Sequence, residues 1–137
     1  MVSEFSEKQK AFIASQGVLR LNSLTPEGQL HSVPLCFAFD GRNFYVHCAN
    51  EGARRWRNLK KNPAASVELD SYTEDWSGNK GLLVYARAIF LQPGQEEQRK
   101  ALSLLKEKYV QYRERFKLND SVAILKLEPS RIMSWFL

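Results

Sequence analysis

The densest group of chemically capable side chains in this sequence is a basic stretch. Within eight consecutive positions the chain carries Arg54, Arg55, Arg57, Lys60 and Lys61, which numerically equals its whole formal net charge of +5. Such residues at the start of a helix suit a phosphate group, because guanidinium forks and unpaired backbone N–H groups both match its oxygens. A solvated basic surface is the alternative interpretation, since most runs of charge are no more than that.

Other groups of side chains that could form a catalytic, metal or nucleotide site are less well supported. Cys36 and Cys48 fall in predicted strands as core or wall residues, so no activated thiol nucleophile is expected. Together with His31 and His47 they have no usual zinc-ligand spacing, and both histidines are expected at polar strand positions. The seven glycines form neither GxGxxG nor GxxxxGK, which excludes the standard nucleotide cradles. We therefore assign no catalytic side chain and no metal site.

The composition is that of one globular domain spanning residues 1–137. Hydrophobic residues make up 44% of the positions, aromatic residues 12% and charged residues 26%, a balance that excludes a disordered or fibrous chain. No run of about 18 apolar residues occurs, and the first residues lack the apolar segment of a secretory signal. We therefore expect a cytoplasmic protein with free thiols and no membrane partner.

Hydrophobic periodicity and turn residues define the elements that must position these side chains. Ser6 and Gln9 have the spacing of a capping box at the start of a helix. Pro34 lies inside a predicted strand and cannot donate to a ladder, so that strand is expected at an edge, bulged or open to a ligand. The predicted order is a helix at 6–15, strands at 18–24, 30–39 and 44–47, a helix at 50–61, strands at 65–69 and 82–91, a helix at 93–116 and a strand at 122–127.

Few helices and mostly antiparallel strands favour the α+β class, with a β-barrel or a strongly curled sheet. One apolar stripe runs along the long helix to Tyr109, Tyr112 and Phe116, and these residues are expected in the core. Trp76 differs, because it lies in a polar loop, residues 71–79, where nothing local could bury an indole. A ligand or a partner subunit is the apolar surface expected beside it.

Several segments in order carry a family resemblance. They read Pro26-Glu27-Gly28-Gln29, Ser32-Val33-Pro34-Leu35, Phe39-Asp40-Gly41 and Arg55-Trp56-Arg57-Asn58-Leu59-Lys60-Lys61-Asn62-Pro63. In this order and spacing they resemble the pyridoxamine-phosphate-oxidase-like flavin-binding split-barrel superfamily, over almost the whole chain. The segment Asp70-Ser71-Tyr72-Thr73-Glu74-Asp75-Trp76 resembles its deazaflavin-dependent branch.

The resemblance implies a six-stranded antiparallel split β-barrel with flanking helices. It implies a homodimer that holds FMN or the deazaflavin coenzyme F-420 in a groove between the subunits. Arg55 falls on the family's phosphate-binding basic position, with Arg54 and Arg57 as neighbouring helpers. Cys48 occupies a position at which a Ser or Thr hydroxyl often assists the phosphate.

The resemblance also implies which residues surround the ring system of the cofactor. Val33, Pro34, Leu35 and Cys36 fall on the strand that lines the ring, largely through backbone groups. Trp76 falls on an aromatic position that typically comes from the partner subunit.

Taken together, these features predict a flavin- or deazaflavin-dependent oxidoreductase that transfers a hydride to or from a small-molecule substrate. In such a protein the cofactor carries the redox chemistry, so no acid or base side chain is required. The alternative is a non-redox module that binds nucleic acid or another phosphorylated ligand through residues 54–61. That module needs exposed aromatic side chains among the charges, and Trp56 alone qualifies within the stretch.

Overall fold

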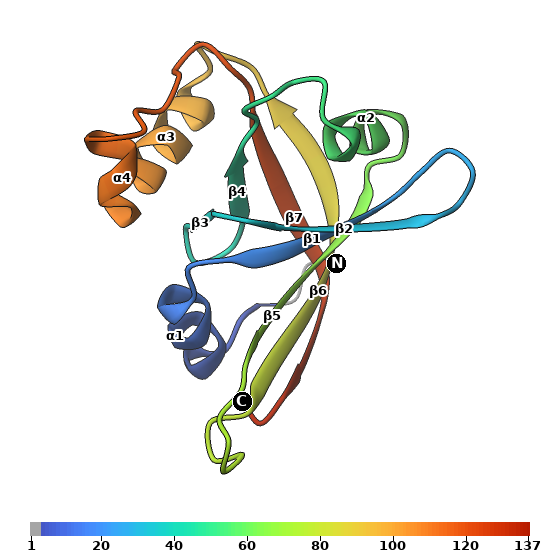
Figure 1. The fold of residues 1–137 in the computed structure, drawn as a ribbon, viewed down its shortest axis with the longest axis vertical. Coiled ribbons are helices and arrows are strands. Elements are labelled where there is room, and N and C mark those ends of the chain that lie inside the picture. The colour runs from blue at the N-terminus through green and yellow to red at the C-terminus, as the bar shows by residue number, and fades with distance from the viewer. Residues whose placement is uncertain (1–3) are drawn as a thin grey trace.

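A curled antiparallel sheet of seven strands forms the centre of the computed structural model, which describes residues 4–137 (Figure 1). Helices flank the sheet, so the fold belongs to the α+β class as predicted. The strands are β1 (Leu19–Leu24), β2 (Leu30–Leu35), β3 (Ala38–Phe39), β4 (Phe44–His47), β5 (Ala64–Ser71), β6 (Lys80–Leu91) and β7 (Ile124–Trp135). The helices are α1 (Glu7–Ser15), α2 (Arg54–Lys61), α3 (Glu96–Lys108) and α4 (Val110–Arg113).

The expectation of six strands is wrong, because the predicted strand 30–39 is two strands. The sheet order is β2-β1-β5-β6-β7-β4-β3, so β2 and β3 lie at opposite edges. Only Cys36 and Phe37 separate them in sequence, and we name these two residues the β2–β3 link. A chain that passes from one edge to the other within two residues forces the sheet to curl. The prediction for Pro34 is confirmed, because β2 is an edge strand whose pairing is with β1.

The predicted end of the last strand at Leu127 is also wrong. β7 continues past Pro129 to Trp135 and pairs with β6 along almost its whole length. The register shifts between Tyr85 and Ala86, so that Ser130 has no partner opposite it. A bulge of this kind lets a strand accommodate Pro129, which has no N–H to give to the ladder.

The helices follow their local signals in part, since the helix predicted at 50–61 begins only at Arg54. In α1 the predicted capping box is present, because the Gln9 N–H donates to Ser6 Oγ at 3.1 Å and the Ser6 N–H donates to Gln9 Oε1 at 2.9 Å. The predicted helix 93–116 instead ends at Lys108. Tyr109 has φ −115° and ψ 108°, and the single turn of α4 follows it.

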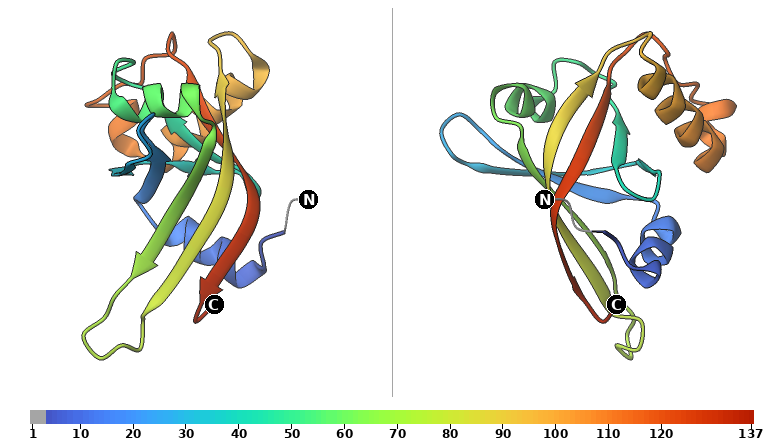
Figure 2. Two further views of the ribbon diagram at one scale, coloured as in Figure 1. Left: turned by 90° about the vertical axis from the view of Figure 1, so that its right-hand side faces the viewer. Right: turned by 180° about the vertical axis from the view of Figure 1, so that it is seen from behind.

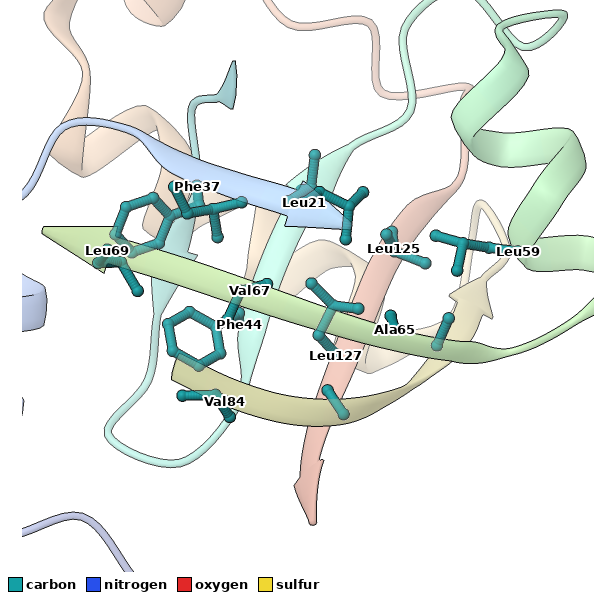
Figure 3. Close-up of a cluster of buried hydrophobic side chains, with 14 of the residues drawn as sticks. Leu21, Phe37, Phe44, Leu59, Ala65, Val67, Leu69, Val84, Leu125 and Leu127 are labelled. Carbon is teal, nitrogen blue, oxygen red and sulfur yellow. The ribbon is translucent and has the colours of Figure 1, made fainter. Parts of the chain in front are cut away.

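Two apolar clusters hold the layers together. The larger one fills the interior of the curled sheet, which we name the barrel, with side chains from β1, β4, β5, β6, β7, α1, α2 and the β2–β3 link (Figure 3). The smaller one lies outside the barrel, where Leu102 and Leu105 of α3 pack against Tyr45 and Ile124. Helix α3 therefore lies on the sheet, as its apolar stripe predicts.

The elements that carry the candidate functional residues lie at different ends of the barrel. Helix α2 covers one end, whereas the loop that joins β5 and β6 projects from the opposite end (Figures 1 and 2). Helices α3 and α4 lie beside β3 and β4 (Figure 1). Among residues 4–137, no helix is both long and apolar enough to cross a membrane.

Candidate functional site

A cleft of about 420 Å³ opens between α2, the β2–β3 link, the end of β4 and the segment around α4. Its volume lies within the range of small-molecule sites, and its walls are mostly apolar with a few polar groups. The side chains that matter most for its chemistry are Leu35, Cys36, His47, Arg55, Tyr112 and Phe116.

Helix α2 positions Arg55 at this cleft. One face of α2 is buried, with Trp56 and Leu59 among the most enclosed side chains of the barrel. The Trp56 indole N–H donates to the Ala49 carbonyl at 3.1 Å, which fixes the helix to the end of β4. The Arg55 guanidinium lies 5.1 Å from the centroid of the Trp56 ring, at a cation–π distance. Packing on a buried indole therefore orders the arginine before any ligand arrives.

Three buried side-chain polar atoms have no hydrogen-bond partner within the described residues, namely His31 Nδ1, Arg55 Nε and Asn58 Oδ1. Arg55 and Asn58 lie one turn apart on the same face of α2. Asn58 donates to Ser23 Oγ at 3.1 Å, and Ser23 is directly opposite His31 in the β1–β2 pair. Asn58 thus lies where α2 faces the β1–β2 hairpin, whereas Arg55 lines the cleft.

The unpaired Arg55 Nε–H is the polar group best placed for an anion. A buried donor without a partner costs about 1–3 kcal/mol, and a phosphate oxygen from a ligand in the cleft would remove that cost. None of the five basic side chains of α2 lies within ion-pair distance of an acidic group in residues 4–137. The residues present therefore fit a phosphorylated cofactor.

The opposite wall of the cleft carries His47 and Tyr112. The His47 ring donates from Nε2 to the Asn119 carbonyl at 3.0 Å, so Nδ1 is the ring nitrogen that this bond leaves unengaged. The ring of Tyr112 lies 6.5 Å from that of His47, and burial raises the pKa of Tyr112 to about 12. Its phenol therefore stays protonated at neutral pH.

The structure brings together three of the nine predicted cofactor-binding residues at this cleft, namely Leu35, Cys36 and Arg55. Val33 is half-buried against the barrel core. Pro34, Arg54 and Arg57 are exposed and do not line the cleft. Whether any of them binds a cofactor stays a prediction.

Cys48 lies away from the cleft surface, in contrast to its expected place beside the phosphate. Its side chain is enclosed in the barrel core, and Sγ is 3.9 Å from the Val46 carbonyl. Burial raises the pKa of the Cys48 thiol to about 12, so it remains neutral. The β4 alternation explains this placement, because Cys48 continues the inward positions of Phe44 and Val46.

Trp76 is not near the cleft within one chain. It lies in the loop at the opposite end of the barrel from α2 (Figure 1), 70% of its surface is exposed, and its φ is 65°. The loop is ordered by its own bonds, since the Gly78 N–H donates to Thr73 Oγ1 at 2.8 Å and the Thr73 N–H donates to Asn79 Oδ1 at 2.9 Å. A loop with its own internal hydrogen bonds therefore presents an exposed indole.

Two aromatic predictions are corrected. Phe116 is 62% exposed rather than in the core, because the helix that would have buried it ends at Lys108. It lines the cleft with Tyr112, and the sequence pattern gave no sign of that break. Trp56 is 1% exposed, so it is not the surface aromatic that the nucleic-acid alternative required.

His, Cys, Asp and Glu side chains of residues 4–137 form no group of three that could hold a metal ion.

Comparison with known families decides which group of proteins the chain falls in. The profile described as pyridoxamine 5'-phosphate oxidase matches residues 5–136. The chain belongs to this family. No curated protein sequence matches it.

Solved structures of the same fold are named for different ligands. The heme storage protein HutZ from Vibrio cholerae has a TM-score of 0.78 at 18% identity, over 96% of this chain and 94% of its own. A FAD-binding protein from Mesorhizobium loti has a TM-score of 0.71 at 19% identity, over 98% of this chain and 95% of its own. An F420 reductase has a TM-score of 0.70 at 16% identity, over 94% of this chain and 98% of its own. At these identities the likeness concerns the fold.

Proposed function

We propose that this pyridoxamine 5'-phosphate oxidase family member is an oxidoreductase that uses FMN or the deazaflavin F-420 on a small-molecule substrate. The observation that carries the proposal is Arg55, which lines a cleft of suitable size and whose buried Nε–H has no partner. The FAD-binding protein and the F420 reductase among its structural relatives support a cofactor of this class.

The residues of the cleft have separate roles in this proposal. Arg55 binds the phosphate through charge-assisted hydrogen bonds, and Trp56 holds its guanidinium in place. Leu35 and Cys36 support the ring, while Tyr112 and Phe116 limit the access of water from the side of α4. The bound flavin or deazaflavin would supply hydride transfer, so the protein contributes binding and orientation.

The proposed assembly is a homodimer in which Trp76 of one subunit approaches the cleft of the other. Exposed apolar side chains on β6, β7 and the loop between β5 and β6 support it, since Tyr85, Met133 and Trp135 are 42–44% exposed and Trp76 is 70% exposed. Exposed aromatic groups of this kind mark contact surfaces. A monomer that still binds cofactor in sedimentation experiments would remove the partner's Trp76 from the site.

Fluorescence titration tests the cofactor directly. Purified protein is added to FMN and, separately, to F-420 at micromolar concentration. Quenching of one ligand that saturates at one equivalent per chain identifies the cofactor. If neither fluorescence changes at stoichiometric protein, the cleft does not bind a flavin-type cofactor and the proposal fails.

Heme is a second candidate ligand, because one observation favours it. His47 lines the cleft and donates its Nε2–H to a backbone carbonyl, an arrangement that typically orients histidine ligands of metals. The heme storage protein among the structural relatives agrees with this possibility. A Soret band that forms with hemin in the wild type and is lost in His47→Ala would support it, whereas an identical band in both would exclude His47 as the ligand.

A further inference from the structure

The β2–β3 link is held by a residue from a distant part of the chain. The Phe37 N–H donates to the hydroxyl oxygen of Tyr109 at 3.0 Å. That hydroxyl lies 2.7 Å from the Gly17 carbonyl and 3.1 Å from the Phe37 carbonyl, and it donates its single proton to this pair of acceptors. One phenol thus ties the link to the segment between α1 and β1.

Lys108 acts on the same link through its charge. Its Nζ lies 3.5 Å from the centroid of the Phe37 ring, and Phe37 is completely buried. An ammonium over an aromatic face at this distance is attracted to the ring. We name Lys108 and Tyr109 the link clamp.

The clamp lies where α3 ends. The backbone at Tyr109 is extended, and its side chain packs against the cluster of Leu102 and Leu105 while its hydroxyl reaches the link. The polar groups of a two-residue link have no strand ladder to satisfy them, so an unpaired Phe37 N–H would be costly.

We propose that Tyr109 is a positioning residue for the cleft. By fixing Phe37 it fixes the neighbouring Cys36, which lines the cleft, and the end of β2 at Leu35. Tyr109 does not itself line the cleft and therefore acts through the link. The effect of Tyr109 on cofactor binding rests on the proposed function.

The chain carries its own reporter of the position of the link. Cys36 is a free and exposed thiol on the link itself. Cys48 is also free but is buried, and its pKa is raised to about 12 by that burial. A thiol reagent therefore labels Cys36 alone while the barrel stays folded.

The experiment compares Tyr109→Phe with Tyr45→Phe. Tyr45 is a matched control, because its buried hydroxyl also makes two hydrogen bonds, at 3.0 Å to Asp40 and 2.7 Å to Glu97, without touching the link. For each protein, the rate of Cys36 alkylation by iodoacetamide is measured by mass spectrometry without cofactor. Affinity for FMN and F-420, the visible spectrum of the bound cofactor and the melting temperature are then measured.

Tyr109→Phe is expected to raise the alkylation rate of Cys36 several-fold. It should also weaken cofactor binding by about tenfold and shift the visible spectrum of the bound cofactor. Tyr45→Phe should lower the melting temperature but leave the alkylation rate and the cofactor affinity near the wild-type values. An unchanged Cys36 rate in Tyr109→Phe would overturn the positioning role. Equal changes in both variants would do the same, since they would show a merely structural effect.

Two further results keep the inference separate from the proposed function. If the wild type binds neither FMN nor F-420, the proposed function fails while the Cys36 rate still decides the role of Tyr109. If Tyr109→Phe does not fold, Lys108→Met removes the charge above Phe37 and keeps an unbranched side chain. Faster hydrogen exchange of the Phe37 amide in that variant is the expected result, and an unchanged exchange rate would contradict the clamp.

Discussion

Helices α2 and α3 differ in how their charges are satisfied. On α3, Glu97 lies 2.8 Å from Lys126, Glu96 lies 3.5 Å from Lys100, and Lys106 lies 3.2 Å from Asp120. On α2, all five basic side chains lack an acidic partner within residues 4–137.

The difference indicates which helix serves stability and which is available to a ligand. Glu97 also accepts a hydrogen bond from the Tyr45 hydroxyl at 2.7 Å, so the polar groups under α3 are already paired within the protein. A hollow of about 440 Å³ beside them has Tyr45 and Glu97 in its wall, but both are already paired. The buried Arg55 Nε under α2 has no such partner. Unsatisfied polar groups, rather than the size of a hollow, identify the candidate site.

The largest expected effect comes from removing the anchor of α2. Trp56→Ala should lower the free energy of unfolding by about 3–5 kcal/mol, because the indole is 1% exposed and its N–H donates to Ala49. Urea denaturation measures the change. A loss below about 1 kcal/mol would show that α2 is not held by this side chain.

The next largest effect is expected when the guanidinium of Arg55, which has no ion-pair partner, is removed. Arg55→Ala should weaken binding of FMN or F-420 by about 2 kcal/mol, the scale of a lost charge-assisted pair, with little change in melting temperature. Lys61→Ala is the matched control, because Lys61 is an exposed basic residue of α2 away from the cleft. Equal and small losses for both variants would mean that α2 is only a basic surface.

On α3, the pairing of the Glu97 carboxylate with Lys126 predicts a contribution to stability that depends on pH. The hydrogen bond from Lys126 lowers the pKa of Glu97 from its ordinary 4.5, so its stabilisation is present above that value and is lost as the pH falls through the lowered pKa. Glu97→Gln should therefore lower the melting temperature at pH 7, and the difference from wild type should narrow below pH 4.5. Glu96→Gln, in an exposed pair, should change little at either pH. A difference that stays constant into acid would contradict the assignment.

The smallest expected effect on stability is at Trp76. Because 70% of its surface is exposed, Trp76→Ala should change the stability of the cofactor-free protein by less than about 1 kcal/mol. If the proposed dimer groove is correct, cofactor affinity should fall instead. Thermal melts with and without cofactor separate the two, and a large fall without cofactor would make Trp76 structural.

Local signals predicted much of the fold. The capping box of α1, the edge position of the strand with Pro34, and the end of α2 before Asn62-Pro63 depend on neighbouring residues, and the structure confirms them. The basic stretch of α2 could be predicted for the same reason, whereas the choice of Arg55 within it came from the family resemblance and its role stays a prediction.

Contacts between distant residues account for what the sequence could not predict. The split of residues 30–39 and the end of α3 are linked, because Tyr109 contacts Phe37 across 72 positions. Continuous strand and helix patterns give no sign of such a contact. The break after Lys108 also leaves Phe116 exposed, although the continuous pattern predicts it in the core, and places it with the half-buried Tyr112 on the wall of the cleft.

Because β7 lies between β6 and β4, the barrel closes late during synthesis. Phe44 pairs with Leu127 and His47 with Ile124, so β4 has no second partner until residues 124–127 have left the ribosome. Until then Phe44 and Val46, both buried in the finished core, have only the two-residue β3 as a neighbouring strand. Non-local pairing of this kind slows folding and leaves apolar strands open to aggregation. Nascent chains of this protein should therefore be most prone to aggregation before β7 emerges.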